Sequence, residues 1–218
     1  MSNYTIHELK KTEDELLNNI FIVYQQTFSP VLRFPQKELR KYIKDDIYTT
    51  NYILDKENNI CGYCFHEYFE EINAVEINYI AVHPNYQGKG LARLLFDYIY
   101  ETYCGPKNNF KILTLECEDS LIGFYKKLGC KIIPVNYEVG CDHHLTIMFK
   151  SSHKIKISDY PKIIKTIKQE NNYCDPIFYK NLEIAFIKLQ LYIKIKANNF
   201  LDRNDLNSYN YYTKEGIS

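Results

Sequence analysis

The sequence predicts an α/β (α+β) protein in which a layered sheet of about seven strands is flanked by about four helices. Residues Val75–Val82 alternate between two sets of side chains, as a strand does. A glycine-rich turn, Gln87–Ala92, follows this strand and opens an amphipathic helix. Segments on both sides continue the pattern in the order β-α-α-β-β-β-α-β-α-β-β, so we expect one layered domain followed by a C-terminal extension.

The N-terminal part is expected to supply two helices and three strands. Residues Thr12–Glu15 have the T-x-x-E pattern of a capping box, which predicts a helix that opens there and continues to Phe28. A second helix is expected after Pro35, with Ile47 among its inward residues. The strands expected here are Tyr4–Leu9, Asn51–Leu54 and Ile60–Tyr68, the last two joined by the polar turn Asp55–Asn59.

The helix after the glycine-rich turn carries apolar residues at the spacing of one buried face, among them Leu91, Leu94 and Leu95. The remaining expected elements are the strand Phe110–Leu115, a short helix that has Leu121 on its apolar side and ends at Gly129, and a hairpin of Lys131–Val135 with His143–Phe149.

The charge of the chain is balanced, with 27 basic and 27 acidic residues, so no basic field exists to collect nucleic acid or anionic lipid. The chain has seven cysteines and begins without the apolar core of a secretory signal, which predicts unpaired thiols in a reducing compartment. No apolar run approaches the ~20 residues that a membrane span needs. We therefore expect a soluble, cytoplasmic protein with no nucleic-acid or membrane partner, and the sequence leaves a homodimer open.

The glycine-rich turn is a candidate anion site. A turn at a helix start directs several backbone N–H groups to one point, and the helix dipole adds positive potential there. Gly88 and Gly90 leave room for a phosphate to approach the backbone. The spacing fits neither a P-loop nor the G-x-G-x-x-G of a dinucleotide fold.

The strand, the sequence Gln87-Gly88-Lys89-Gly90-Leu91-Ala92 and the following helix together resemble the acetyl-CoA-binding motif of the GNAT N-acetyltransferases, Q/R-x-x-G-x-G/A. Leu121–Cys130 resembles a second motif of that family, A-x-x-F/L-Y-x-K-x-G-F, with Cys130 in place of the usual Phe. The resemblance covers about residues 3–150. It implies a mixed, mainly antiparallel GNAT-like sheet in an acetyltransferase domain over residues 1–150, and it leaves residues 151–218 as an extension of unknown role, which we expect to be mainly helical.

The resemblance also implies an activity, the transfer of an acetyl group from acetyl-CoA directly to a primary amine of a small molecule or protein, with no metal. Asp119 stands where the family commonly has an Asn that hydrogen-bonds the pantetheine arm, and a carboxylate can accept but not donate there. A backbone N–H near Val82 is expected to face the developing oxyanion. The implied acetyl-CoA-binding residues are Ala81, Val82, Gln87, Gly88, Lys89, Gly90, Leu91, Ala92, Asp119, Tyr125 and Lys127.

Two residues are candidates for catalysis. Glu76 lies on the strand before the turn, and strict alternation places it on the same face as Ile80 and Val82. Apolar neighbours would suit it to accept the proton of the amine. Tyr125 matches the Tyr that lies near the CoA sulfur in many family members, which implies that it protonates the departing thiolate. The alternatives are an exposed edge carboxylate for Glu76 and simple core packing for Tyr125.

Other interpretations remain open. Cys61 and Cys64 have a C-x-x-C spacing, but no second pair completes a zinc site, and residues three apart on a strand face opposite sides. His143 and His144 open the last expected strand, near where a substrate could enter, and nothing in the sequence supports a Cys-His nucleophile pair. Two other functions compete with a general amine acetyltransferase: a protein-lysine acetyltransferase, and a non-catalytic acyl-CoA-binding module that uses residues 151–218 for interaction.

Overall fold

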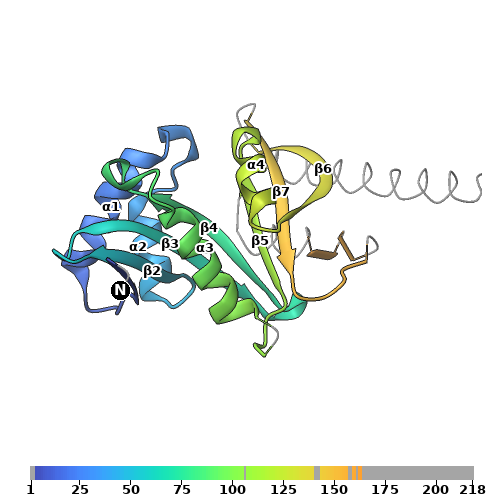
Figure 1. Ribbon diagram of the computed structural model, residues 1–218, viewed down its shortest axis with the longest axis horizontal. Coiled ribbons are helices and arrows are strands. Elements are labelled where there is room, and N and C mark those ends of the chain that lie inside the picture. The colour runs from blue at the N-terminus through green and yellow to red at the C-terminus, as the bar shows by residue number, and fades with distance from the viewer. Residues whose placement is uncertain (1–2, 106, 140–142, 157–158, 161, 164–218) are drawn as a thin grey trace, which may run out of the picture. The chain divides into compact units, whose positions relative to one another are not determined.

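The structure is a computed structural model of the 218-residue chain and describes residues 3–105, 107–139, 143–156, 159–160 and 162–163. A seven-stranded sheet with the order β1-β2-β3-β4-β5-β7-β6 organises the fold (Figure 1). Its strands are β1 Tyr4–Glu8, β2 Thr49–Asp55, β3 Ile60–Phe69, β4 Ala74–Val82, β5 Ile112–Cys117, β6 Lys131–Val139 and β7 His143–Ser151. The helices are α1 Asp14–Thr27, α2 Gln36–Lys44, α3 Leu91–Ile99 and α4 Asp119–Lys127, with short 3-10 turns η1 Pro30–Leu32, η2 Glu70–Ile72 and η3 Pro84–Tyr86 and a π-helical turn η4 Tyr100–Cys104. The expected fold class and the expected order of elements are confirmed.

The chain divides into two compact units, one made of Met1–Ile132 with Ile147–Lys154 and the other of Ile133–Thr146 with Ile155–Ser218. The first unit contains strands β1 to β5, all four α-helices and every residue expected to bind acetyl-CoA. In the second unit, Tyr160 and Ile163 are buried. Most of the predicted helical extension lies outside the described residues, so the domain boundary at residue 150 stays a prediction.

Each face of the sheet in the first unit carries its own apolar layer. Strands β1 to β4 pair antiparallel, and β4 pairs with β5 in parallel. Figure 1 shows α3 in front of this sheet and α1 and α2 behind it. The layer that we call the α3 face includes Cys64, Ile77, Val82, Leu95, Phe96 and Tyr125. The layer that we call the α1 face includes Ile20, Tyr24, Leu39, Tyr63, Phe65 and Ala81.

A β-bulge in β4 breaks the alternation of its side chains. Phe65 lies opposite Tyr79, but the next residue of β3, His66, lies opposite Ile77, so Asn78 is the extra residue. Because opposite residues of an antiparallel pair point to the same side, Glu76 shares the α1 face with Tyr79. The expectation that Glu76 lies on the same face as Ile80 and Val82 is therefore wrong.

Helix α1 begins at Asp14, and the predicted capping box at Thr12–Glu15 is wrong. Glu13 occupies the N-cap position and makes no side-chain cap bond. Its carboxylate accepts a hydrogen bond from the Lys10 amide at 2.8 Å instead. The Glu13 side chain thus closes the turn that precedes the helix rather than capping the helix, which begins at Asp14.

Three residues that were expected to face inward are exposed: Ile47 (44%), Leu94 (40%) and Leu121 (43%). Ile47 lies beyond the end of α2, after Asp46 with its φ of 59° has turned the chain. The buried face of α3 includes Phe96 and leaves out Leu94, which was expected to belong to it. Among the described residues, no helix is long and apolar enough to cross a membrane.

Candidate functional site

The turn from β4 into α3 depends on two glycines with positive φ, 76° at Gly88 and 79° at Gly90. A Cβ at either position would meet no atom within 4 Å. The glycines are therefore required by the left-handed backbone rather than by crowding within the chain. Gly90 is the N-cap of α3, and the residues from Gln87 to Gly90 are all exposed.

The start of α3 carries a group of backbone donors that make no hydrogen bond within the helix. The first helical hydrogen bond runs from the Leu94 amide to the Gly90 carbonyl, at 3.0 Å. The amides of Leu91, Ala92 and Arg93 precede it and therefore have no acceptor within the helix. Together with the helix dipole they would favour an anion, so the turn keeps the geometry of the candidate anion site, and its role stays a prediction.

Side chains around the turn hold it to the neighbouring strands. The Gln87 amide nitrogen donates to the Val82 carbonyl at 3.3 Å. The Tyr86 hydroxyl donates to an Asp55 carboxylate oxygen at 2.6 Å, and the Lys89 ammonium lies 4.7 Å from the centre of the Tyr86 ring. The bond from Tyr86, with those from Asn59, lowers the pKa of Asp55 to about 2, and Asp55 raises the pKa of Tyr86 to about 12. The turn is thus tied to the β2–β3 hairpin, and Lys89 stays beside it.

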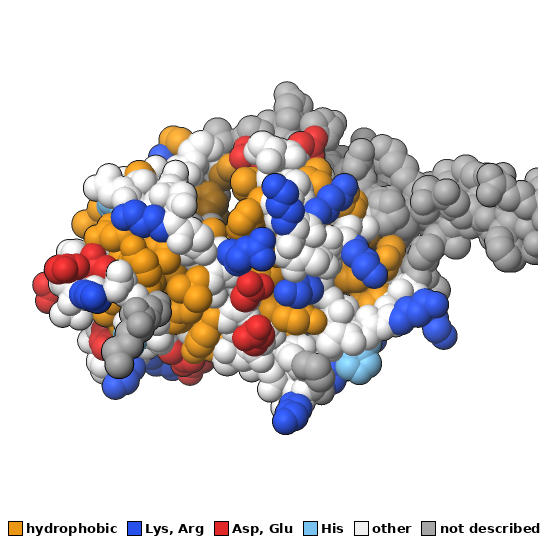
Figure 2. All heavy atoms as spheres, in the orientation of Figure 1, with side chains coloured by type: hydrophobic (Ala, Val, Ile, Leu, Met, Phe, Trp, Pro, Cys, Tyr) orange, Lys and Arg blue, Asp and Glu red, His pale blue; other side chains and the backbone are white. Residues whose placement is uncertain are grey.

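Before the turn is reached, β4 and β5 separate. Their ladder ends with the pair Ile77 and Leu115, although β4 continues to Val82 and β5 to Cys117. Figure 1 shows the two strands diverging from this point. In the space-filling view the surface is hollowed beside α4, and hydrophobic side chains line the hollow (Figure 2).

The edge of β4 that faces this gap carries backbone hydrogen-bonding groups. The His83 amide donates to the Cys61 carbonyl at 2.8 Å, which makes these two a hydrogen-bonded pair. Bonded and non-bonded pairs alternate along an antiparallel ladder. The N–H and C=O groups of Ile80 and Val82 therefore point away from β3 and into the gap. The Val82 carbonyl accepts from Gln87, and an extended polar ligand could pair with the other groups.

Glu76 lies on the α1 face next to the point where the gap begins. Its side chain is buried, with 3% of its surface exposed. It stands directly opposite Glu67 in the β3 ladder and beside Thr114 in the β5 ladder. Glu67 is also buried and accepts a 2.6 Å hydrogen bond from the amide of Asn78.

Tyr125 lies on the α3 face, on helix α4. It is buried, and its ring is 5.9 Å from that of Phe96. Burial raises the pKa of its hydroxyl, so the phenol stays protonated across the physiological range. Asp119 is the first residue of the same helix and Lys127 the last, and both are exposed.

The expected acetyl-CoA-binding residues thus fall into two groups of neighbours in the chain. Ala81 and Val82 end β4 immediately before the turn Gln87–Ala92, and Asp119, Tyr125 and Lys127 share α4. The two candidate catalytic residues, Glu76 and Tyr125, lie on opposite faces of the sheet. Sequence reasoning missed Glu67 and Asn78. Because Asn is disfavoured inside a strand, Asn78 could have indicated the bulge in the sequence.

The metal interpretation gains nothing from the structure. Cys61 and Cys64 pack in the same apolar layer, contrary to the expectation of opposite faces, because the β2–β3 register shifts next to Cys61. Burial raises the pKa of the Cys61 thiol to about 11 and that of Cys64 further. Within the described part of the chain, no three His, Cys, Asp or Glu side chains are grouped to hold a metal ion. The side chains of His143 and His144 are outside the described residues.

Comparisons with known proteins identify proteins of the same fold. Residues 48–131 match the family model described as the acetyltransferase (GNAT) domain, and no curated protein matches the sequence. A solved structure described as a GNAT-family acetyltransferase from Bacteroides thetaiotaomicron superposes with a TM-score of 0.60 at 16% identity, covering 73% of this chain and 93% of that one. The ribosomal-protein-S18-alanine N-acetyltransferase of Escherichia coli superposes with a TM-score of 0.54 at 18% identity, covering 70% of this chain and 96% of that one. The spermidine/spermine N-acetyltransferase SpeG of Vibrio cholerae, in mutant forms, superposes with a TM-score of 0.53 at 18% identity, covering 69% of this chain and 95% of that one. At these identities the similarity shows a shared fold.

Proposed function

Because residues 48–131 match the model of the acetyltransferase (GNAT) domain, we propose that the chain is an acetyl-CoA-dependent acyltransferase that transfers an acetyl group from acetyl-CoA directly to a primary amine. The observation that carries the proposal is that two groups of backbone hydrogen-bonding atoms, at the start of α3 and along the edge of β4, lie next to each other in the chain. The amides at the start of α3, which have no acceptor within the helix, follow directly on the open edge of β4. One suits a pyrophosphate and the other an extended amide chain, and acetyl-CoA contains both in that order.

The donor would lie along this surface as follows. Its pyrophosphate accepts hydrogen bonds from the turn Gln87–Ala92, with Lys89 as an adjacent charge. Its pantetheine arm runs along β4 beside Ala81 and Val82, with Asp119 and Lys127 contributing from α4. The Val82 N–H is placed to donate to the thioester oxygen as negative charge develops on it.

The position of the two candidate catalytic groups on opposite faces suits a direct transfer in the gap between β4 and β5. On the α1 face, Glu76 takes the proton of the amine, directly or through a water molecule. The amine nitrogen then forms its bond to the carbonyl carbon, and the carbon–sulfur bond breaks. On the α3 face, Tyr125 gives its proton to the departing thiolate and regains one from solvent.

Two measurements test the proposal. Acetyl-CoA should raise the melting temperature by mass action on the folded state. Thiol release with a panel of primary amines and lysine peptides should then exceed the rate without acceptor, with the acetylated product identified by mass spectrometry. Binding without turnover on any acceptor would favour the non-catalytic acyl-CoA-binding module. Absence of binding would refute the proposed donor site.

A further inference from the structure

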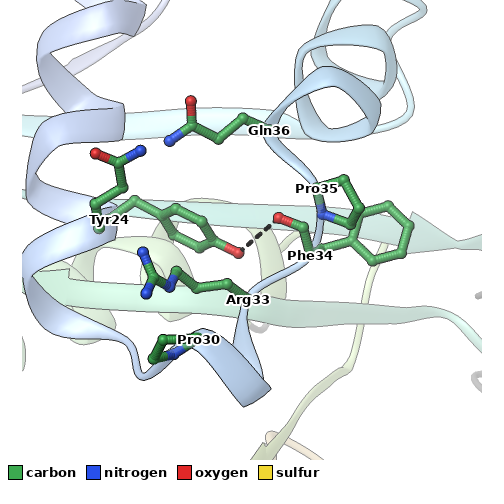
Figure 3. Close-up of a pocket in the computed structure, with 7 residues that line it drawn as sticks. Tyr24, Pro30, Arg33, Phe34, Pro35 and Gln36 are labelled. Atoms are coloured by element: carbon green, nitrogen blue, oxygen red, sulfur yellow. Dashed lines mark hydrogen bonds between the residues drawn. The ribbon is translucent and has the colours of Figure 1, made fainter.

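A pocket of about 290 Å³ lies between α1 and the segment that joins η1 to α2. Figure 3 shows its two walls, with Arg33 and Gln36 projecting from the η1–α2 side toward α1. The lining residues are Tyr24, Gln25, Pro30, Arg33, Phe34, Pro35 and Gln36. None of the acetyl-CoA-binding residues named above contributes to it.

The wall that carries Arg33 is fixed to the sheet. The Tyr79 hydroxyl donates to the Leu32 carbonyl and accepts from the Phe34 amide, both at 3.1 Å. The Tyr24 hydroxyl donates to the Phe34 carbonyl, also at 3.1 Å (Figure 3). Tyr79 lies on the α1 face of β4, just past the point where the ladder to β5 ends. The pocket is therefore anchored on the same face of the sheet as Glu76.

The lining of the pocket carries a positive charge that no described carboxylate pairs with. Arg33 is its one charged lining residue, and the lining contains no carboxylate. The Arg33 Nε atom is buried without a hydrogen-bond partner, and within the described residues Arg33 forms no ion pair. Arg40 on the neighbouring helix differs, since it bonds to Asp14 at 3.2 Å and to Asn18 at 2.6 Å. A guanidinium whose buried Nε–H has no acceptor is suited to a planar or tetrahedral oxyanion.

We propose that this pocket binds a carboxylate or phosphate group of the acetyl acceptor, with Arg33 as the ionic contact and Gln25 and Gln36 as additional hydrogen-bonding groups. The inference rests on the proposed acetyltransferase function and specifies its substrate class: a small amine that also carries an anionic group. A polyamine is disfavoured, because a second cation would be placed beside an uncompensated guanidinium.

Matched acceptors test the inference. We compare kcat/KM for a primary amine bearing a carboxylate, the same amine as its carboxamide, an amine bearing a phosphate, and spermidine. The anionic amines should be preferred, and Arg33→Gln should reduce their kcat/KM by about 10–100-fold, mainly through KM, while the carboxamide changes little. Arg33→Lys should retain part of the preference, since it keeps the charge without the bidentate geometry. Lys37→Gln removes an exposed charge of α2 outside the pocket and serves as the matched control.

A binding measurement separates this inference from the proposed function. Inorganic phosphate is titrated into the protein while the backbone amides of α1, η1 and α2 are followed by NMR. Shifts in the wild-type protein that Arg33→Gln removes support the anion pocket even if no amine is acetylated. Equal use of anionic and neutral amines, unaffected by Arg33→Gln, overturns the pocket and leaves the acetyltransferase intact. Absence of both acetylation and phosphate shifts overturns both.

Discussion

Glu76 lies directly opposite Glu67 in the antiparallel ladder of β3 and β4, and both side chains are buried, with 3% and 6% of their surfaces exposed. Opposed residues in such a ladder have Cβ atoms about 4.5–5.5 Å apart, so two ionised carboxylates here repel each other. Asn78, the bulge residue, holds Glu67 through a 2.6 Å hydrogen bond. The bulge therefore both turns Glu76 to the α1 face and stabilises the acid beside it.

Glu76→Gln should lower kcat by about 10²–10⁴-fold, the contribution of a well-placed general base. The substitution preserves shape and lies away from the α3 turn, so the affinity for acetyl-CoA should remain. The acidic limb of the pH profile should flatten, and raising the pH should partly restore the rate as free amine becomes abundant. Steady-state kinetics across pH, with thermal shift for acetyl-CoA binding, provide the measurement.

Glu67→Gln should have a different effect, because it removes the neighbouring charge and keeps a side chain that can accept the Asn78 bond. With the repulsion gone, Glu76 should stay ionised at lower pH, so the acidic limb of kcat/KM should move to lower pH while kcat at neutral pH changes less than in Glu76→Gln. An unmoved limb would mean that Glu67 serves packing only.

The turn should tolerate alanine better than a negative charge. Gly90 has a φ of 79° with open space where a Cβ would lie, so Gly90→Ala should cost stability, by about 1 kcal/mol, through backbone strain alone. Gly90→Glu adds bulk and negative charge at the anion site and should abolish the rise in melting temperature with acetyl-CoA. Full affinity in a folded Gly90→Glu protein would place the pyrophosphate elsewhere.

The backbone geometry of the candidate donor site could be predicted from the sequence because its determinants are local. A strand, two glycines and an amphipathic helix follow one another between Val75 and Ile99, and the structure keeps them in that relation. The same local reasoning predicted the end of α4 at Gly129, whose φ of 89° requires glycine.

The face of Glu76 and its opposition to Glu67 could not be predicted in this way. Both depend on one inserted residue, Asn78, and on the register between two strands, which alternation within one strand does not determine. Arg33 was missed for a related reason. Its significance lies in a buried Nε atom that no acceptor among the described residues meets, and this depends on how the segment between η1 and α2 packs against α1.

Acid should destabilise the protein through His66, which is fully buried. One ring nitrogen, Nε2, bonds to the Asn51 side-chain oxygen at 2.8 Å, and Nδ1 is buried without a partner. Burial lowers the pKa of His66 from 6.5 to about 3. Between these two values the unfolded state binds the proton and the folded state does not, so stability should fall as the pH drops below about 6.5, by about 1.4 kcal/mol per pH unit from this group.

Urea unfolding of the wild-type protein and of His66→Gln, measured between pH 7 and 4, checks this contribution. Gln does not titrate, so the slope of the unfolding free energy against pH should become shallower by about 1.4 kcal/mol per pH unit, which is the contribution of one proton. Parallel curves for the two proteins, or an NMR titration that shows the His66 ring protonated at pH 5 in the folded state, would contradict the assignment.

Tyr125→Phe should slow the reaction less than Glu76→Gln and leave the acidic limb in place. The phenol is buried with a raised pKa, so it is a proton donor at every working pH, and Phe retains the ring contact with Phe96 at 5.9 Å. A CoA thiolate is a fair leaving group without help, because thiols have pKa values near 8.5, so losing this proton should reduce kcat by a smaller factor. Steady-state kinetics of both variants with one acceptor make the comparison, and equal acetyl-CoA affinity is the control. If Tyr125→Phe is inactive while Glu76→Gln turns over almost normally at neutral pH, Glu76 is not the base, and the enzyme works chiefly by positioning an amine that solvent deprotonates.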